Sequence, residues 1–192
     1  RRLTELLDKN KPLDVKKAAS ILRNTKGSGN KNIGLTNEMA INQFIAHHSV
    51  IFKPEQRIIW VSTHPWQMGK YAAYDLNKIF GEDTDFRKEI YSTEYTIPED
   101  SLIHGDMFSN LLTYKELTKD IKAKTKEKSS VSSGILNKYE ASNPEYYHMY
   151  EIVGDYYLSQ GEIEKAKDYW QKALTKEIPK VSEKERILKK SK

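Results

Sequence analysis

The stretch that decides the fold covers residues 42–63 and reads "NQFIAHHSVIFKPEQRIIWVST". It contains two runs rich in aromatic and β-branched residues, separated by the polar link "KPEQ", whose proline favours a turn. Two such runs with a short link predict an antiparallel β-hairpin. We expect its first strand to cover about residues 40–52. The later run "YAAYDLNKIF", residues 71–80, predicts a third short strand that leads into a turn.

Two adjacent histidines, His47 and His48, stand inside the first expected strand. Neighbouring residues of a strand point to opposite faces, so the two imidazoles are not expected to bind one metal ion. The chain contains no cysteine and no HExxH spacing, and we therefore expect no metal site. Polar residues gather at the Asn42 end of this strand. That end either lines a pocket or carries ordinary polar residues of a core or sheet edge.

Composition indicates a globular chain without a membrane-spanning segment. Of the 192 residues, 31% are charged and 38% are hydrophobic. No apolar run approaches the roughly 20 residues that cross a bilayer. The formal net charge is +5, but the lysines are concentrated in the tail "KERILKKSK" and in a stretch that also carries acids. A solvated helix face and a basic tail account for this charge, so no nucleic-acid partner is expected.

Helical patterns lie on both sides of the expected strands. Residues 13–24 place four apolar side chains at helical spacing, just after Pro12. From Pro98 onward the sequence becomes helical, with acids near the start and lysines near the end of the first helix. The segment "SSVSSG", residues 129–134, is the best candidate for a linker.

Residues 147–180 have the pattern of a tetratricopeptide-like helix pair. Asn143 and Pro144 offer a cap and a first-turn proline for the first helix. Large, small and aromatic residues recur at the spacing of such a repeat, at Tyr150, Val153, Gly154, Tyr157, Gly161, Ala166, Trp170 and Ala173. Because only one copy is visible, the pair must pack on another helix, a neighbouring domain or another chain.

A longer segment, residues 18–80, is similar to a known enzyme family. It reads "AASILRNTKGSGNKNIGLTNEMAINQFIAHHSVIFKPEQRIIWVSTHPWQMGKYAAYDLNKIF". It resembles the acyl-CoA:6-aminopenicillanic acid acyltransferase family, the isopenicillin-N acyltransferase-like, choloylglycine hydrolase-like branch of the N-terminal-nucleophile hydrolases. The parts "AHHSVIFKP", "WVS" and "YDLNKIF" look like a bacterial version. The resemblance covers about residues 1–80, the last helices and strands of the family's sandwich.

This resemblance implies a four-layer αββα sandwich whose precursor cleaves itself to expose a cysteine. The thiol of that cysteine is the nucleophile and its own α-amine is the base. Since the chain has no cysteine, we expect it to be the C-terminal part of such an enzyme, with the nucleophile upstream of Arg1. The parent protein is expected to act on linear amides without a cofactor and, by family analogy, to be exported from a bacterial cell.

Four residues are candidates for lining the substrate pocket: Asn42, Gln43, His47 and His48. Family members carry an arginine before the penultimate strand, and Gln43 stands near that position here, so the positive charge is missing. A neutral amide can hydrogen-bond an acyl carbonyl, but it does not neutralise a carboxylate as an arginine does. No catalytic residue is expected within this chain.

The prediction is therefore an α+β chain of two parts. Residues 1–97 are the C-terminal part of a hydrolase-like domain that handles a small-molecule amide or acyl substrate, and residues 98–192 are an all-α extension with the tetratricopeptide-like pair. In the alternative hypothesis the chain is a non-catalytic interaction module, whose helix pair binds a peptide or a partner domain.

Overall fold

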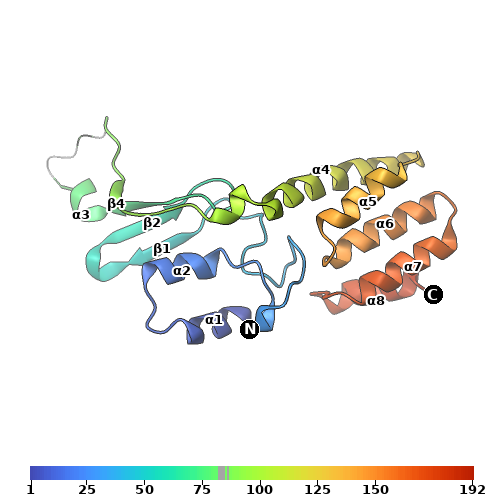
Figure 1. Ribbon diagram of the computed structural model, residues 1–192. Helices are drawn as coiled ribbons and strands as arrows, with labels where there is room; N and C mark the ends of the chain where they lie inside the picture. The colour runs from blue at the N-terminus through green and yellow to red at the C-terminus, as the bar shows by residue number, and fades with distance from the viewer. Residues whose placement is uncertain (82–84, 86) are drawn as a thin grey trace. The chain divides into compact units, whose positions relative to one another are not determined.

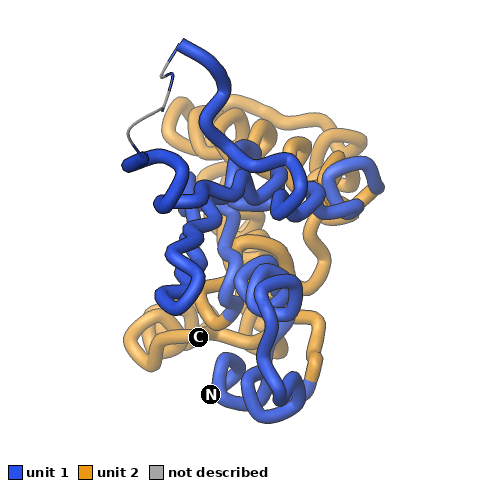
Figure 2. The backbone as a smooth tube through the Cα atoms, turned by 90° about the vertical axis from the view of Figure 1, so that its left-hand side faces the viewer, with its two compact units in different colours: residues 1–29, 40–105 blue, residues 30–39, 106–192 orange. Residues whose placement is uncertain are grey.

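A computed structural model describes residues 1–81, 85 and 87–192 and confirms the α+β class (Figure 1). In this part of the chain there are eight α-helices and one four-stranded antiparallel sheet. The chain forms two compact units (Figure 2). Residues 1–29 and 40–105 make up the α+β unit, and residues 30–39 and 106–192 make up the helical unit.

Short helices and one sheet build the α+β unit. Its elements in chain order are α1 (Arg2–Lys9), α2 (Val15–Leu22), β1 (Val50–Lys53), β2 (Ile58–Ser62), β3 (Tyr71–Asp75), α3 (Leu76–Ile79) and β4 (Ser92–Ile97). The strands pair in the order β1-β2-β3-β4, each antiparallel to the next. Asp14 caps α2 by accepting the backbone N–H of Lys17 at 2.8 Å, which agrees with the helix expected there.

β1 and β2 form the predicted hairpin. Val50 pairs with Val61, and Lys53 pairs with Ile58. Between the strands, Pro54–Gln56 forms a 3-10 turn that ends at Arg57, whose φ of 54° is left-handed. This conformation costs an arginine about 1 kcal/mol. The pairing of the two strands offsets that cost.

The prediction of a strand over residues 40–49 is wrong, because β1 begins only at Val50. Asn42 explains the difference: its side-chain oxygen accepts the backbone N–H of Phe44 at 2.9 Å, and Phe44 has a left-handed φ of 55°. A local bond of this kind competes with the ladder bonds of a sheet. The expected alternation of faces therefore does not apply to His47 and His48, and both are exposed.

One face of the sheet packs against α2. Its core consists of buried residues from the helix and the strands: Ala19, Ile58, Trp60, Tyr71, Ala73 and Ile97. Trp60 also donates its indole N–H to the carbonyl of Tyr95 at 2.8 Å, which ties β2 to β4. Burial of a large aromatic side chain whose polar group stays hydrogen-bonded stabilises the packing on this face of the sheet.

The other face of the sheet is also apolar, and we call it the open sheet face. The strand register places six residues on it: Val50, Phe52, Ile59, Val61, Ala72 and Tyr74. Val50 is 57% exposed and Phe52 is 54% exposed. A two-sided antiparallel sheet with one face in water normally alternates apolar and polar residues. On β1, β2 and β3, the positions of the open sheet face that would normally be polar are apolar.

Helices make up nearly all of the helical unit. They are α4 (Asp106–Glu127), α5 (Ser133–Ser142), α6 (Tyr147–Ser159), α7 (Ile163–Leu174) and α8 (Val181–Lys190). The helix expected from Pro98 begins at Asp106 instead, after a 3-10 turn at Ser101–His104. The expected linker, residues 129–134, joins α4 to α5 inside this unit, and the Ser132 side chain caps α5.

The segment of residues 30–39 packs on the helices. Asn143 accepts the backbone N–H of Leu35 at 2.8 Å and donates to the Leu35 carbonyl at 3.0 Å. Asn37 donates to the carbonyl of Glu177 at 3.0 Å. Because the side-chain oxygen and nitrogen of Asn143 both bond the backbone of Leu35, Asn143 does not cap α6 as predicted. That helix begins at Tyr147 with Tyr146 as its N-cap.

α6 and α7 approach closely where the sequence places small residues. A Cβ on Gly154 would lie 2.5 Å from the indole nitrogen of Trp170 and 3.1 Å from the carbonyl oxygen of Ala166. Trp170 is only 3% exposed, and its indole N–H donates to Asp155 at 3.1 Å. The ring is therefore held from several sides and has little room to shift.

Gly154→Ala should lower the free energy of unfolding by up to about 2 kcal/mol. Overpacking a tight contact costs roughly 1–3 kcal/mol, while alanine gains only about 1 kcal/mol in helix propensity. Gly134→Ala in α5 is the matched control, because a Cβ there meets nothing within 4 Å. Chemical denaturation should show that variant unchanged or slightly more stable. Equal effects of the two substitutions would contradict the packing argument.

Candidate functional site

Asn42 and Gln43 lie in the loop that precedes β1. Asn42 is 1% exposed and donates to the carbonyl of Trp66 at 3.4 Å and to the sulfur of Met68 at 3.0 Å. With the bond it accepts from Phe44, its amide is fully used within the protein. Gln43 donates to the carbonyl of Ala40 at 3.3 Å and lines a hollow of about 390 Å³. Of the two, only Gln43 is placed to meet a ligand.

The two histidines have different surroundings. The Nδ1 atom of His48 lies 3.0 Å from the carbonyl oxygen of Ser62, so Nδ1 carries the proton. This bond fixes the imidazole against the end of β2. His47 is exposed and is not part of the hollow at Gln43. The structure therefore does not bring the four predicted residues together around one point.

A pair of loops, residues 40–49 and 63–70, meets through Asn42, and we call it the loop pair. Besides Phe44, two residues of the second loop have left-handed backbone, Trp66 (φ 39°) and Gln67 (φ 58°). Such residues cost roughly 1–3 kcal/mol each and cluster at functional sites. Within the α+β unit, the loop pair thus contains most of the non-glycine residues that are held in an unfavourable left-handed backbone conformation. The sequence shows no sign of this, because neither residue is a glycine.

The side chain of Arg23 fixes the second loop of the loop pair by a hydrogen bond. The guanidinium donates through Nη2 to the carbonyls of Gly69 at 2.7 Å and Pro98 at 2.8 Å, and it lies 4.9 Å from the centre of the Tyr71 ring. Burial lowers the pKa of Arg23 and raises that of Tyr71. The Nε atom of Arg23 has no hydrogen-bond partner among the described residues. Sequence reasoning missed this residue, because its partners are 46 and 75 residues away.

The hydroxyl groups of Ser49, Ser62 and Tyr71 lie together beside the loop pair. Ser49 hydrogen-bonds the hydroxyl of Tyr71, and the backbone N–H of Ser49 donates to the Ser62 hydroxyl at 2.7 Å. The His48 ring meets the carbonyl of Ser62 and not its hydroxyl. A serine nucleophile needs a base that accepts its proton. These contacts position the loops and the strand ends, and they do not assemble a serine-based catalytic centre.

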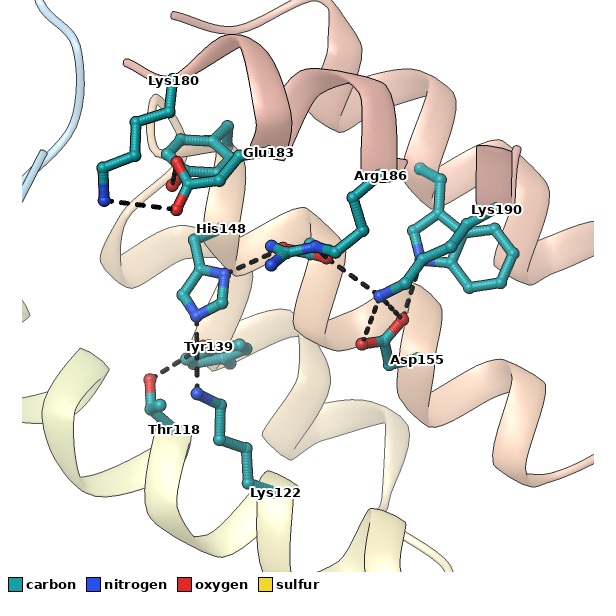
Figure 3. A network of polar contacts seen from close by, with 12 residues as sticks. Thr118, Lys122, Tyr139, His148, Asp155, Lys180, Glu183, Arg186 and Lys190 are labelled. Carbon is teal, nitrogen blue, oxygen red and sulfur yellow. Dashed lines mark hydrogen bonds and ion pairs between the residues drawn. The ribbon is translucent and has the colours of Figure 1, made fainter. Parts of the chain in front are cut away.

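The densest polar network of the described residues lies in the helical unit (Figure 3). At its centre is Glu151 of α6, which is 2% exposed. Arg186 of α8 donates to both carboxylate oxygens, at 3.1 and 2.9 Å, and Lys190 donates to one of them at 2.9 Å. Lys190 also reaches Asp155 at 2.9 and 3.0 Å. The network therefore fastens α8 to α6.

His148 extends the network toward α4. Its Nδ1 atom donates to Glu151 at 3.1 Å, so Nε2 is the acceptor that faces the ammonium of Lys122 at 3.4 Å (Figure 3). Burial alone raises the pKa of Glu151, but hydrogen bonds from His148, Lys190 and Arg186 lower it to about 2. The carboxylate is thus charged at neutral pH although it is removed from water.

The network forms the floor and one wall of a hollow of about 420 Å³. The lining comes from three helices and consists of Lys122, Thr125, Lys126, His148, Glu151, Ile152, Asp155, Arg186 and Lys190. We call this the charged hollow. A signal for it existed in the sequence: acids at positions 151 and 155 and bases at 186 and 190 repeat at four-residue spacing. Nothing local shows that the two helices are neighbours.

Neither a metal centre nor a membrane span is found in the described part of the chain. No group of three or more histidine, aspartate or glutamate side chains there is arranged to hold a metal ion. No helix in residues 1–81, 85 and 87–192 combines the length and the apolar character that crossing a bilayer requires.

Comparison of the chain with protein-family models, with curated proteins and with solved structures finds no match.

Proposed function

We propose that the α+β unit is part of a cysteine-nucleophile hydrolase or acyltransferase that acts on linear amides. In this proposal the sheet is one of the two stacked sheets of an αββα sandwich, and α2 belongs to the outer layer. The chain contains no cysteine, and the proposal places the nucleophile in a segment upstream of Arg1. The proposal joins the family resemblance of residues 18–80 to one structural observation.

That observation is the open sheet face. Stacked sheets of a sandwich lie about 10 Å apart and bury apolar side chains between them. The open sheet face carries apolar residues of three neighbouring strands: Val50 and Phe52 on β1 are 57% and 54% exposed, the β2 residues and Tyr74 are half-buried, and Ala72 is buried. Contiguous apolar surface of this kind marks an interaction site. A second sheet would cover it and would leave α2 on the outside.

The loop pair is the part of this unit that we assign to substrate contact. Gln43 is the single amide in a hollow otherwise lined by Ile41, Ile45 and Ala46. An apolar hollow with one polar group suits an acyl chain whose carbonyl accepts a hydrogen bond. Asn42 and His48 act one step further away, because they hold the loop in place.

An N-terminal cysteine is the decisive test. The protein should be isolated from its native source and measured by intact-mass and peptide mass spectrometry. We expect residues 1–192 to lie on a longer chain whose first residue is a cysteine. Iodoacetamide should modify the thiol of that cysteine and abolish hydrolysis of a linear amide. A chain that contains these residues but has no N-terminal cysteine would overturn the proposal.

A further inference from the structure

The charged hollow carries more positive than negative charge. Four cationic side chains line it and only two carboxylates do, from Glu151 and Asp155. Arg186 and Lys190 pair with these carboxylates at 2.9 Å. The two positive charges that remain are on the opposite wall, on α4.

Lys122 and Lys126 are these surplus cations. They lie one turn apart on the same face of α4, and both are exposed. Neither forms an ion pair with a carboxylate of the described residues, and no acid stands three or four positions from either along the helix. The only bond of Lys122 in the network is to the neutral nitrogen of His148, at 3.4 Å. A carboxylate is a stronger partner for an ammonium than this contact.

We propose that the charged hollow binds an acidic peptide segment of a partner protein. Two neighbouring carboxylates of the peptide pair with Lys122 and Lys126. The peptide chain crosses the hollow over Ile152 and approaches Arg186, whose side chain is 51% exposed and uses only Nε and Nη2 for Glu151. The inference concerns the helical unit alone and does not depend on the amide-hydrolase proposal.

The floor of the hollow favours a peptide over a nucleic acid. Glu151 and Asp155 are fixed carboxylates between the two basic walls. A phosphate backbone places a charge on every nucleotide and would bring some of these charges against the floor. A peptide can instead place carboxylates at the walls and an uncharged side chain over Ile152. The volume of about 420 Å³ is sufficient for a few side chains.

Binding of the fluorescein-labelled peptide Glu-Glu-Ala-Ala-Glu-Glu to the full chain, followed by fluorescence anisotropy, tests this inference. We expect saturable binding that weakens at least tenfold in Lys122→Gln/Lys126→Gln and survives in Lys122→Arg/Lys126→Arg. The matched control is Lys124→Gln/Lys138→Gln, which removes the same charge from positions outside the hollow. Its affinity should change less than twofold. The matching peptide with glutamine in place of each glutamate should not bind.

Three outcomes would overturn the inference. The acidic peptide fails to bind; both glutamine variants lose the same affinity, which indicates attraction to net charge alone; or a hexathymidylate binds more tightly than the acidic peptide and is the ligand that depends on Lys122 and Lys126. Circular dichroism of each variant at neutral pH confirms that the helices remain folded, as expected for changes at lysines that are exposed or, at Lys124, half-buried.

Discussion

Glu151→Gln should destabilise the helical unit by about 2–4 kcal/mol. Removing one partner of a buried ion pair typically costs 3–5 kcal/mol, because the remaining charges lose their compensation. The cost is smaller here, since Arg186 and Lys190 keep some exposure and can regain water. Urea unfolding at pH 7 measures the change, and hydrogen exchange of the α6 amides assigns it to this unit. Glu164→Gln on α7, whose side chain is 89% exposed, should have almost no effect.

Acid titration gives an independent check on Glu151. Its pKa of about 2 in the folded protein lies below its ordinary value of 4.5, so the unfolded state binds the proton more readily. The stabilisation is complete above about pH 4.5 and is lost as pH falls toward 2, with a size of roughly 3 kcal/mol. Glu151→Gln should lack this acid-dependent part. An identical loss of stability in both proteins between pH 4.5 and 2 would show that Glu151 does not carry it.

Phe52→Asp should be mild in one form of the protein and strongly destabilising in another. In the present chain the side chain is 54% exposed, so the change should cost less than about 1 kcal/mol. In the longer, cysteine-bearing protein that we propose, a second sheet would bury this position. An unpaired carboxylate between two sheets should then cost roughly 3 kcal/mol or more and lower amide hydrolysis through loss of folded enzyme. Thermal unfolding of both forms measures the difference.

Leu112→Asp is the matched control for Phe52→Asp. Leu112 is a similarly exposed apolar residue, at 46%, but it lies on α4 in the helical unit. Its replacement should have a small and equal effect in both forms of the protein. If Phe52→Asp is as mild in the longer form as in the present chain, then no second sheet covers the open sheet face.

Periodicity predicted the elements whose stability is local. The hairpin follows from two β-rich runs and a proline-containing link, and the register of Val50 with Val61 agrees with it. The small residues of the helix pair at Gly154 and Ala173 also lie where the spacing predicted close packing. In each case the sequence segment contains both the apolar residues and the turn that orients them.

Contacts between segments that are distant in the sequence could not be predicted from local sequence patterns. The expected strand begins only at Val50, because Asn42 bonds Phe44 locally and the distant Trp66 and Met68 through its amide nitrogen, although an alternating pattern continues across it. β4 was not predicted, because three of its six residues are exposed and only Ile97 is buried. At the candidate sites, Arg23 and Glu151 depend on partners that the chain reaches only after folding. A side chain's role there is decided by tertiary neighbours and not by its own spacing.

The placement of residues 30–39 has a consequence for dissecting this protein. The polypeptide passes from one unit to the other three times, near residues 29, 39 and 105, so neither unit is encoded by one uninterrupted stretch. A truncation after residue 105 would leave Leu35 and Asn37 without the partners they have at Asn143 and Glu177, more than 100 positions later. Contacts of such long range slow folding, because a large loop must close before they form. Severing a single connection cannot release either unit intact, so the two are a poor choice for separate expression and are better studied on one chain.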